Sequence, residues 1–391
     1  MTTFSSARRS LSAIPLVMLS AACGDPASPP QQPAHLAIVT VGESHSCGLT
    51  AAGIAYCWGA GVLGAVGDGT DTSRSSPVRV AGGLTFIALS AGLNHTCGVA
   101  VGGTGYCWGF APEGGLGVPA AISRVPVALE GAPTLSQITA GAGYSCGLTS
   151  TGDAYCWGSG TLGQLGTGKY ANDTTPALIA GGLTFLTIDA GGGHTCAIAS
   201  DDETYCWGSN FYGQLGTGDT TAADSVPAKV FGGLQFRQIS AGLRHTCGVT
   251  ATGAAYCWGE ALYGQLGNGA RQDKSVPAAV GGGLQFQTIS AGNGHTCGIG
   301  THGRAYCWGV GDAGQLGTGT PIVGDSLPRP VAGALSFRTI SAGDFHTCGT
   351  TIDDAAYCWG ADGNGRLGSV PTQVCSYFRC NPSPQPVKEL P

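Results

Sequence analysis

The cysteines are the residues with the clearest chemical potential in this sequence. The chain contains 17 cysteines, and fourteen of them form seven pairs whose members stand ten residues apart. In six pairs a histidine stands two residues before the first cysteine, as His45 does before Cys47. Such residues could form disulfides in an oxidising compartment or hold zinc. The seven pairs are Cys47 and Cys57, Cys97 and Cys107, Cys146 and Cys156, Cys196 and Cys206, Cys247 and Cys257, Cys297 and Cys307, and Cys348 and Cys358; Cys375 and Cys380 form an eighth, more closely spaced pair.

One cysteine, Cys23, has no such partner, and its surroundings indicate lipid attachment. The segment from Leu19 to Cys23 resembles the lipobox of bacterial lipoproteins, in which the cysteine becomes the lipid-modified N-terminus after cleavage. A basic pair and a short apolar run precede it, as in an export signal. We therefore expect a signal peptide over residues 1–22, a lipid on Cys23 and a tether over residues 23–34. Simple secretory cleavage nearby is the alternative.

The cysteine pairs recur because the chain from about residue 35 consists of one repeat. Tyr-Cys-Trp-Gly occurs seven times, at intervals of 49 to 51 residues. A period of that size indicates a propeller or a solenoid. The 69 glycines and 21 prolines exclude a helix-rich fold. We predict an all-β fold over residues 35–391, a seven-bladed β-propeller of four-stranded repeats, with a β-solenoid as the alternative.

Each repeat contains four predicted strands, which we call A to D in chain order. Strand A is apolar, B contains His-x-Cys, C contains Tyr-Cys-Trp, and D starts near a proline. The longest connection joins C to D, so we expect the order D-A-B-C from the channel outward. The strand near residues 387–390 would then pair with the strand near residues 36–41 and close the ring.

This strand assignment decides between the two kinds of cysteine chemistry. The paired cysteines face each other across the tight B–C hairpin, at a separation that a disulfide can span. A zinc site made by His45, Cys47 and Cys57 is the weaker alternative, because Tyr144 replaces the histidine in the third repeat. We expect the disulfides to fix C as the outermost strand, the histidines to form a loop-fixing hydrogen bond, and the tryptophans to pack between blades.

The repeat also resembles a known family. The unit Gly-x-x-His-[Ser/Thr]-x-x-Leu-x9-Trp-Gly-x5-Gly-Gln-Leu-Gly is similar to the repeat of the regulator of chromosome condensation superfamily. The resemblance implies a seven-bladed propeller that acts as a binding platform. Nuclear members exchange nucleotide on a small GTPase through a wedge inserted in one blade, and secreted bacterial members include β-lactamase inhibitor proteins. Because the repeats are uniform to within one residue, we expect no wedge. The cysteine pairs favour the secreted branch of the family. The Gly-Gln-Leu-Gly turn begins at Gly163, Gly213, Gly264 and Gly314.

Composition and motifs restrict the function. The net charge is −6 and charged residues make up 10% of the chain, whereas nucleic-acid binding needs clustered cations. No catalytic constellation recurs among the repeats. We expect a non-catalytic monomer without cofactor or metal that binds another protein, in the bacterial cell envelope through its lipid anchor or secreted. The alternatives are a carbohydrate-binding or hydrolytic propeller and, by family analogy, a guanine-nucleotide exchange factor.

Differences between repeats predict where the partner binds. In an antiparallel blade the A→B and C→D connections emerge on one face, which we call the loop face. The short B→C and D→A turns emerge on the opposite face, the turn face. The loop-face connections vary most and contain the aromatic and arginine residues that dominate binding hot spots. The predicted contact residues are Phe211, Tyr212, Arg244, Glu260, Tyr263 and Phe345.

Overall fold

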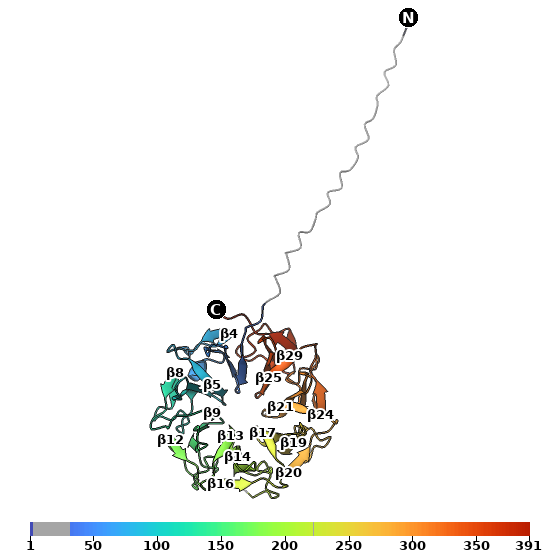
Figure 1. The fold of residues 1–391 in the computed structure, drawn as a ribbon. Helices are drawn as coiled ribbons and strands as arrows, with labels where there is room; N and C mark the ends of the chain where they lie inside the picture. Colours follow the sequence, from blue (N-terminus) through green and yellow to red (C-terminus); the bar gives the residue numbers. More distant parts are fainter. Residues whose placement is uncertain (3–31, 222) are drawn as a thin grey trace. The chain divides into compact units, whose positions relative to one another are not determined.

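The structure, a computed structural model, describes residues 1–2, 32–221 and 223–391. Its contacts divide the chain into residues 1–31 and 32–391, and the second unit is a ring of seven sheets (Figure 1). The predicted signal peptide, Cys23 and most of the tether lie outside the described residues. Within the described ranges, no helix has the length and apolar character needed to cross a membrane.

Each sheet is one blade built from one repeat, and the blades are numbered in chain order. Blade 1 contains β1 (Ile38–Val41), β2 (His45–Leu49), β3 (Ala55–Gly59) and β4 (Arg74–Arg79), with the short 3-10 helix η1 (Val62–Gly64) before β4. Blade 2 contains β5 (Phe86–Ala91), β6 (His95–Ala100), β7 (Gly105–Phe110) and β8 (Ile122–Ala128). Blade 3 contains β9 (Gln137–Ala140), β10 (Tyr144–Leu148), β11 (Ala154–Gly158) and β12 (Asp173–Leu178).

The remaining blades follow the same plan, and only the last one departs from it. Blade 4 contains β13 (Phe185–Ala190), β14 (His194–Ala199), β15 (Thr204–Ser209) and β16 (Ala223–Lys229). Blade 5 contains β17 (Phe236–Ala241), β18 (His245–Thr250), β19 (Ala255–Gly259) and β20 (Lys274–Ala279). Blade 6 contains β21 (Phe286–Ala291), β22 (His295–Gly300), β23 (Ala305–Val310) and β24 (Gly324–Pro330). Blade 7 contains β25 (Phe337–Ala342), β26 (His346–Thr351), β27 (Ala356–Ala361), β28 (Gln373–Cys375) and β29 (Phe378–Pro386).

The strand order in each blade is A-B-C-D, so the predicted order D-A-B-C is wrong. The A strands surround the central channel and the D strands form the outer edge (Figure 1). Strand D pairs with C of its own blade, as Tyr56 of β3 pairs with Arg79 of β4. The long C→D connection does not cross to the next blade. It forms a turn that packs against that blade, and the carbonyl of Ala65 accepts the Trp108 indole N–H at 3.0 Å.

The ring also closes differently from the prediction. All four strands of blade 1 come from residues 38–79 and all strands of blade 7 from residues 337–386, so the chain ends share no blade. The ends meet instead through isolated bridges, Pro33 with Lys388 and His35 with Ala355. The residues 33–36 therefore lie beside the B→C turn and the C-terminal end of blade 7, which belong to the turn face.

Seven disulfides join strands B and C in the seven blades, and an eighth closes a hairpin in blade 7. Because B and C are the two middle strands, the bridges fix the centre of each blade. The expectation that they fix the outermost strand is therefore wrong. Within the described part of the chain, no three His, Cys, Asp or Glu side chains gather as a metal site. The pairs are Cys47–Cys57, Cys97–Cys107, Cys146–Cys156, Cys196–Cys206, Cys247–Cys257, Cys297–Cys307, Cys348–Cys358 and Cys375–Cys380.

The hydrophobic core lies between the blades, as predicted for the tryptophans. Seven tryptophans are completely buried, and each packs against the preceding blade. Trp108 of blade 2, for example, lies in one cluster with Cys47 and Leu49 of blade 1 and contacts Phe86 with ring centroids 5.9 Å apart. Burial of an aromatic side chain at each interface is the main source of cohesion between neighbouring blades.

Blade 7 contains an additional strand, so the expectation of uniform repeats is wrong for the last unit. Its sheet has the order β25-β26-β27-β29-β28. The chain takes 27 residues from Tyr357 to the strand-D proline Pro384, whereas the other blades take 20 to 22 to the equivalent proline. The Tyr-Cys-Trp-Gly spacing could not reveal this insertion, because no later repeat follows it.

Candidate protein-binding face

A belt of buried hydrogen bonds links neighbouring blades directly below the loop face. His245 Nε2 lies 2.8 Å from Thr296 Oγ1 of the next blade, and that hydroxyl donates to the Gln265 carbonyl at 2.8 Å. Since the threonine proton is used, the histidine must donate from Nε2. Burial lowers the pKa of His245 to about 3, which keeps the ring neutral. Equivalent pairs are His45 with Thr96, His95 with Ser145, His194 with Thr246, His295 with Thr347 and His346 with Ser46.

The histidines were expected to form a loop-fixing hydrogen bond, and the structure adds that each bond crosses to the next blade. In blade 3 the tyrosine performs the same task with different atoms. The Tyr144 hydroxyl donates to the His194 carbonyl at 2.5 Å and lies 3.0 Å from Thr195 Oγ1. The belt therefore runs around the whole ring despite the substitution.

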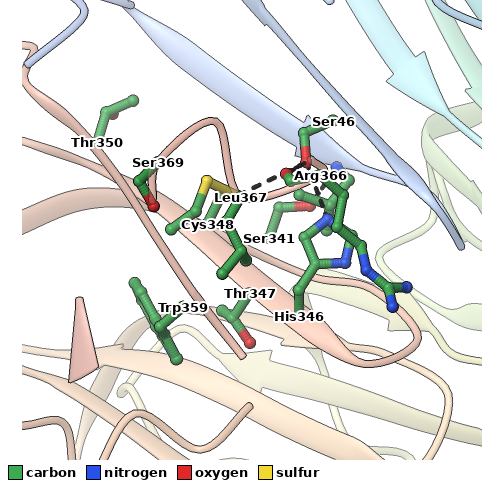
Figure 2. Close-up of a disulfide and its surroundings, with 12 residues drawn as sticks. Ser46, Ser341, His346, Thr347, Cys348, Thr350, Trp359, Arg366, Leu367 and Ser369 are labelled. Atoms are coloured by element: carbon green, nitrogen blue, oxygen red, sulfur yellow. Dashed lines mark hydrogen bonds between the residues drawn. A yellow bond between two sulfur atoms is a disulfide. The ribbon is translucent and has the colours of Figure 1, made fainter. Parts of the chain in front are cut away.

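The closure seam between blades 7 and 1 belongs to the same belt (Figure 2). Ser46 Oγ lies 2.8 Å from His346 Nε2 and donates to the Arg366 carbonyl, also at 2.8 Å. In the six other interfaces the tryptophan indole donates to the corresponding carbonyl, but the buried Trp58 Nε1 at the seam has no hydrogen-bond partner among the described residues. Arg366 Nη1 forms a further bond across the seam by donating to the Glu43 carbonyl of blade 1 at 2.9 Å.

A second ring of hydrogen bonds surrounds the channel. At one position of each A strand, a side-chain oxygen accepts a backbone N–H of the next blade at 2.9 to 3.1 Å. The acceptor in blade 4 is the carboxylate of Asp189, and burial raises its pKa to about 6. Glycines allow neighbouring blades to approach closely around the channel. A Cβ on Gly191, for example, would lie only 2.3 Å from the Gly242 carbonyl oxygen. The seven acceptors are Thr40, Ser90, Thr139, Asp189, Ser240, Ser290 and Ser341.

On the loop face, a pocket of about 330 Å³ lies where blades 3, 4 and 5 meet. Its aromatic wall is formed by Phe211 and Tyr212 from the C→D connection of blade 4. The opposite wall contains Leu243 and Arg244 from the A→B connection of blade 5, and Leu162 of blade 3 completes the rim. Two loops that are distant in sequence therefore combine an apolar surface with one cation.

Polar contacts hold this pocket in shape. Gln214, from the Gly-Gln-Leu-Gly turn, accepts the Tyr212 backbone N–H at 2.9 Å and donates to Ser209 Oγ at 3.2 Å. The Arg244 guanidinium lies 5.2 Å from the Tyr212 ring centroid, a cation–π distance, and its Nη1 is 3.5 Å from Glu260 Oε1. Burial raises the pKa of the Glu260 carboxyl, and Arg244 pulls it part of the way back.

Comparison with known proteins identifies the family. The model of the RCC1-like domain matches residues 19–336, and that of the regulator of chromosome condensation (RCC1) repeat matches residues 337–366. The chain belongs to the RCC1-like domain family. No curated protein matches it at a significant level.

Solved structures share the RCC1-like fold at low sequence identity. Human WBSCR16 superposes with a TM-score of 0.73 at 20% identity, covering 80% of this chain and 87% of that one. Prp20p of Saccharomyces cerevisiae gives a TM-score of 0.70 at 23% identity, with coverage of 78% and 80%. The ectodomain of the Physcomitrella patens receptor kinase CR4 gives 0.53 at 24% identity, with coverage of 82% and 73%. Identities of this size show the fold alone.

The predicted contact residues occupy three places on this RCC1-like ring. Phe211, Tyr212 and Arg244 line the pocket, with Glu260 bonded to the arginine. Tyr263 is 44% exposed beside Gly294 of blade 6, one interface further on. Phe345 lies on blade 7, where its ring packs against Phe378.

Sequence reasoning missed several residues that shape this face. Gln214 positions the aromatic turn, and no role was predicted from the sequence for this residue of the Gly-Gln-Leu-Gly turn. Asp189 was missed because one carboxylate replaces a hydroxyl in an otherwise uniform ring, and only an alignment of the seven A strands shows the exception. Tyr377 and Phe378 were missed because they belong to the insertion of the last unit.

Proposed function

We propose that this RCC1-like propeller is a protein-binding module that acts without catalysis, and that its partner contacts the loop face over blades 4 and 5. One observation supports this proposal above the others: Phe211, Tyr212 and Arg244 form one pocket. Aromatic and arginine side chains around a preformed pocket are typical of binding hot spots. Gln214 fixes the turn beforehand, which lowers the entropy lost on binding.

Two structures of one neighbour, the yeast protein Prp20, support a protein as the partner. The yeast protein Prp20p is described with binding properties to Gsp1p and to histones. Yeast RCC1 (Prp20) has been crystallised with Kap60 bound. These partners are those of the yeast protein, and they support a protein as the class of partner proposed here.

We further propose that the chain is exported and anchored by a lipid on Cys23. Eight disulfides are typical of an oxidising compartment. The chain enters the propeller at Pro33 and His35, which pair with Lys388 and Ala355 at the turn face. Cys23→Ser should move the protein from the membrane fraction to the soluble fraction, and a variant that stays with the membrane would contradict the anchor.

Site-specific photo-crosslinking tests the binding face. Benzoylphenylalanine replaces Phe211, which is 59% exposed on the loop face, or Val101, a matched position on a B→C turn that is 66% exposed. After illumination of producing cells, we expect a discrete adduct with another protein from position 211 and none from position 101. The opposite pattern would place the partner on the turn face and overturn the proposal.

A further inference from the structure

The insertion in blade 7 forms a rigid hairpin on the loop face. Strand β28 pairs with the start of β29, with Cys375 opposite Phe378, so only Ser376 and Tyr377 form the turn. The Cys375–Cys380 disulfide closes the hairpin. Among the described sheets, blade 7 is the one in which a fifth strand has been added.

The base of the hairpin is fixed to the ring at several points. Asn381 accepts the Thr372 backbone N–H at 2.8 Å and donates to Ser369 Oγ at 3.1 Å. The Pro382 carbonyl accepts the Gly319 N–H of blade 6 at 2.8 Å. Both cysteines of the hairpin are buried. The base therefore cannot move independently of blades 6 and 7.

Phe345, one of the predicted contact residues, packs against the hairpin through Phe378. Its ring centroid lies 5.5 Å from that of Phe378, and the Arg366 guanidinium lies 5.8 Å from it on the blade side. Phe345 and Phe378 thus join the A→B connection of blade 7 to the hairpin. This arrangement explains why an aromatic residue stands at position 345, and it assigns Phe345 a supporting role.

The tip of the hairpin, by contrast, exposes apolar side chains. Tyr377 is 94% exposed and Val374 is 69% exposed. Isolated apolar residues are common on protein surfaces, but these two lie three residues apart on one disulfide-closed projection, where both are available for contact. Because the disulfide and the anchored base already restrict the tip, a partner would lose little entropy in ordering it.

We propose that this hairpin is a docking knob that inserts Tyr377 into an apolar pocket of a partner protein whose rim is acidic. We expect the rim of the partner's pocket to be acidic because Arg379 is the only charged residue from Ser369 to Cys380. A membrane surface is disfavoured, because a single cation on a chain of net charge −6 attracts anionic lipid weakly. This proposal rests on the proposed function, because it requires the partner to be a protein. It adds the blade 7 hairpin as a second contact region.

The test uses the full chain with benzoylphenylalanine at position 377, compared with positions 211 and 101. We expect position 377 to form an adduct with the same protein that position 211 captures, and position 101 to form none. An adduct with a second copy of this chain, with lipid or with glycan would overturn the knob. An empty result at 377 with a protein adduct at 211 would overturn the knob and leave the proposed function intact. Empty results at both positions would overturn both.

Affinity for the captured protein then measures the contribution of the knob. Tyr377→Ala should weaken binding at least tenfold, while Tyr377→Phe, which keeps the ring, should stay within threefold of wild type. Arg379→Gln should weaken binding about threefold, and the loss should shrink at high salt because the contact is electrostatic. Tyr377 is almost fully exposed, so the melting temperature should not change. Binding by Tyr377→Ala within threefold of wild type would overturn the proposal.

Discussion

The hydrogen-bonded belt and the loop face above it are adjacent in the chain, yet they differ in how far the seven blades resemble one another. The belt position at the start of strand B is histidine in six blades and Tyr144 in the third. The residue immediately before it lies on the loop face and differs widely. Around the ring that residue is Ser44, Asn94, Gly143, Gly193, Arg244, Gly294 and Phe345.

Burial accounts for this difference. Belt side chains are buried and depend on atoms of the next blade, so a change on one side leaves an unsatisfied polar group on the other. Loop-face side chains such as Phe211 and Arg244 are exposed, and the fold tolerates many residues there. The ring thus separates a layer that determines stability from a layer that is free to determine binding.

Removing an interface tryptophan should produce the largest effect. Trp258→Ala deletes a completely buried ring and the indole bond to the Gln214 carbonyl, which measures 2.9 Å. We expect the free energy of unfolding to fall by about 3–5 kcal/mol. Phe211→Ala, the matched change on the loop face, should alter it by less than about 0.5 kcal/mol. Urea unfolding of both variants measures the difference, and equal losses would contradict the two-layer account.

Asp189 is the exception within the repeated channel ring, and it should make stability depend on pH. Its pKa is raised from 3.8 to about 6, so the folded state binds the proton more tightly than the unfolded state. Stability should therefore decrease as pH rises from about 4 to about 6, by up to ~3 kcal/mol. Asp189→Ser restores the hydroxyl found at this position in blades 5 to 7, and should remove this dependence. Thermal melts across this pH range test the claim, which fails if both proteins show the same slope.

Removing one blade disulfide should destabilise the ring by slightly less. Replacing Cys247 and Cys257 together by serine opens a loop whose ends are ten residues apart, which is worth about 2.8 kcal/mol in the chain-entropy model. The same double change at Cys375 and Cys380 should reduce global stability less, because that bridge closes a shorter loop at the surface. Denaturant midpoints under non-reducing conditions compare the two variants. A larger loss from the surface pair would contradict the assignment of stability to the inner layer.

The smallest expected effect distinguishes the closure seam from the other interfaces. Trp258→Phe loses the bond to the Gln214 carbonyl, whereas Trp58→Phe loses none, because Trp58 Nε1 has no partner. We expect the seam variant to be less destabilised by about 1 kcal/mol. Matched denaturation curves measure this difference, and an equal or larger loss at Trp58 would show that the seam tryptophan is bonded in solution.

Much of the fold could be predicted from the sequence because each repeat corresponds to one blade. Seven Tyr-Cys-Trp-Gly motifs and the ten-residue cysteine spacing predicted seven blades and their B–C bridges. The inter-blade packing of the tryptophans was also predicted. The prediction that Phe211, Tyr212 and Arg244 share one face required only the alternation of strand direction, and the structure brings them into one pocket.

The missed features depend on contacts that spacing does not report. The predicted strand order was wrong because the long C→D connection was taken to cross from one blade to the next. In the structure this connection forms a turn that packs against the tryptophan of the next blade. The blade 7 hairpin lies after the last motif, where the repeat provides no further reference. The direction of the histidine bonds depends on how neighbouring blades approach, and no local pattern contains that information.

Binding by single alanine variants tests the central claim most directly. Phe211, Tyr212, Arg244 and Tyr263 are replaced singly, with Val101→Ala as the turn-face control, and affinity for the cross-linked partner is measured beside the melting temperature. The account predicts that at least one loop-face variant loses tenfold or more in affinity, about 1.4 kcal/mol, with an unchanged melting temperature, while the control stays within twofold. If none of the four loses more than about threefold and Val101→Ala does, the loop face is not the binding face.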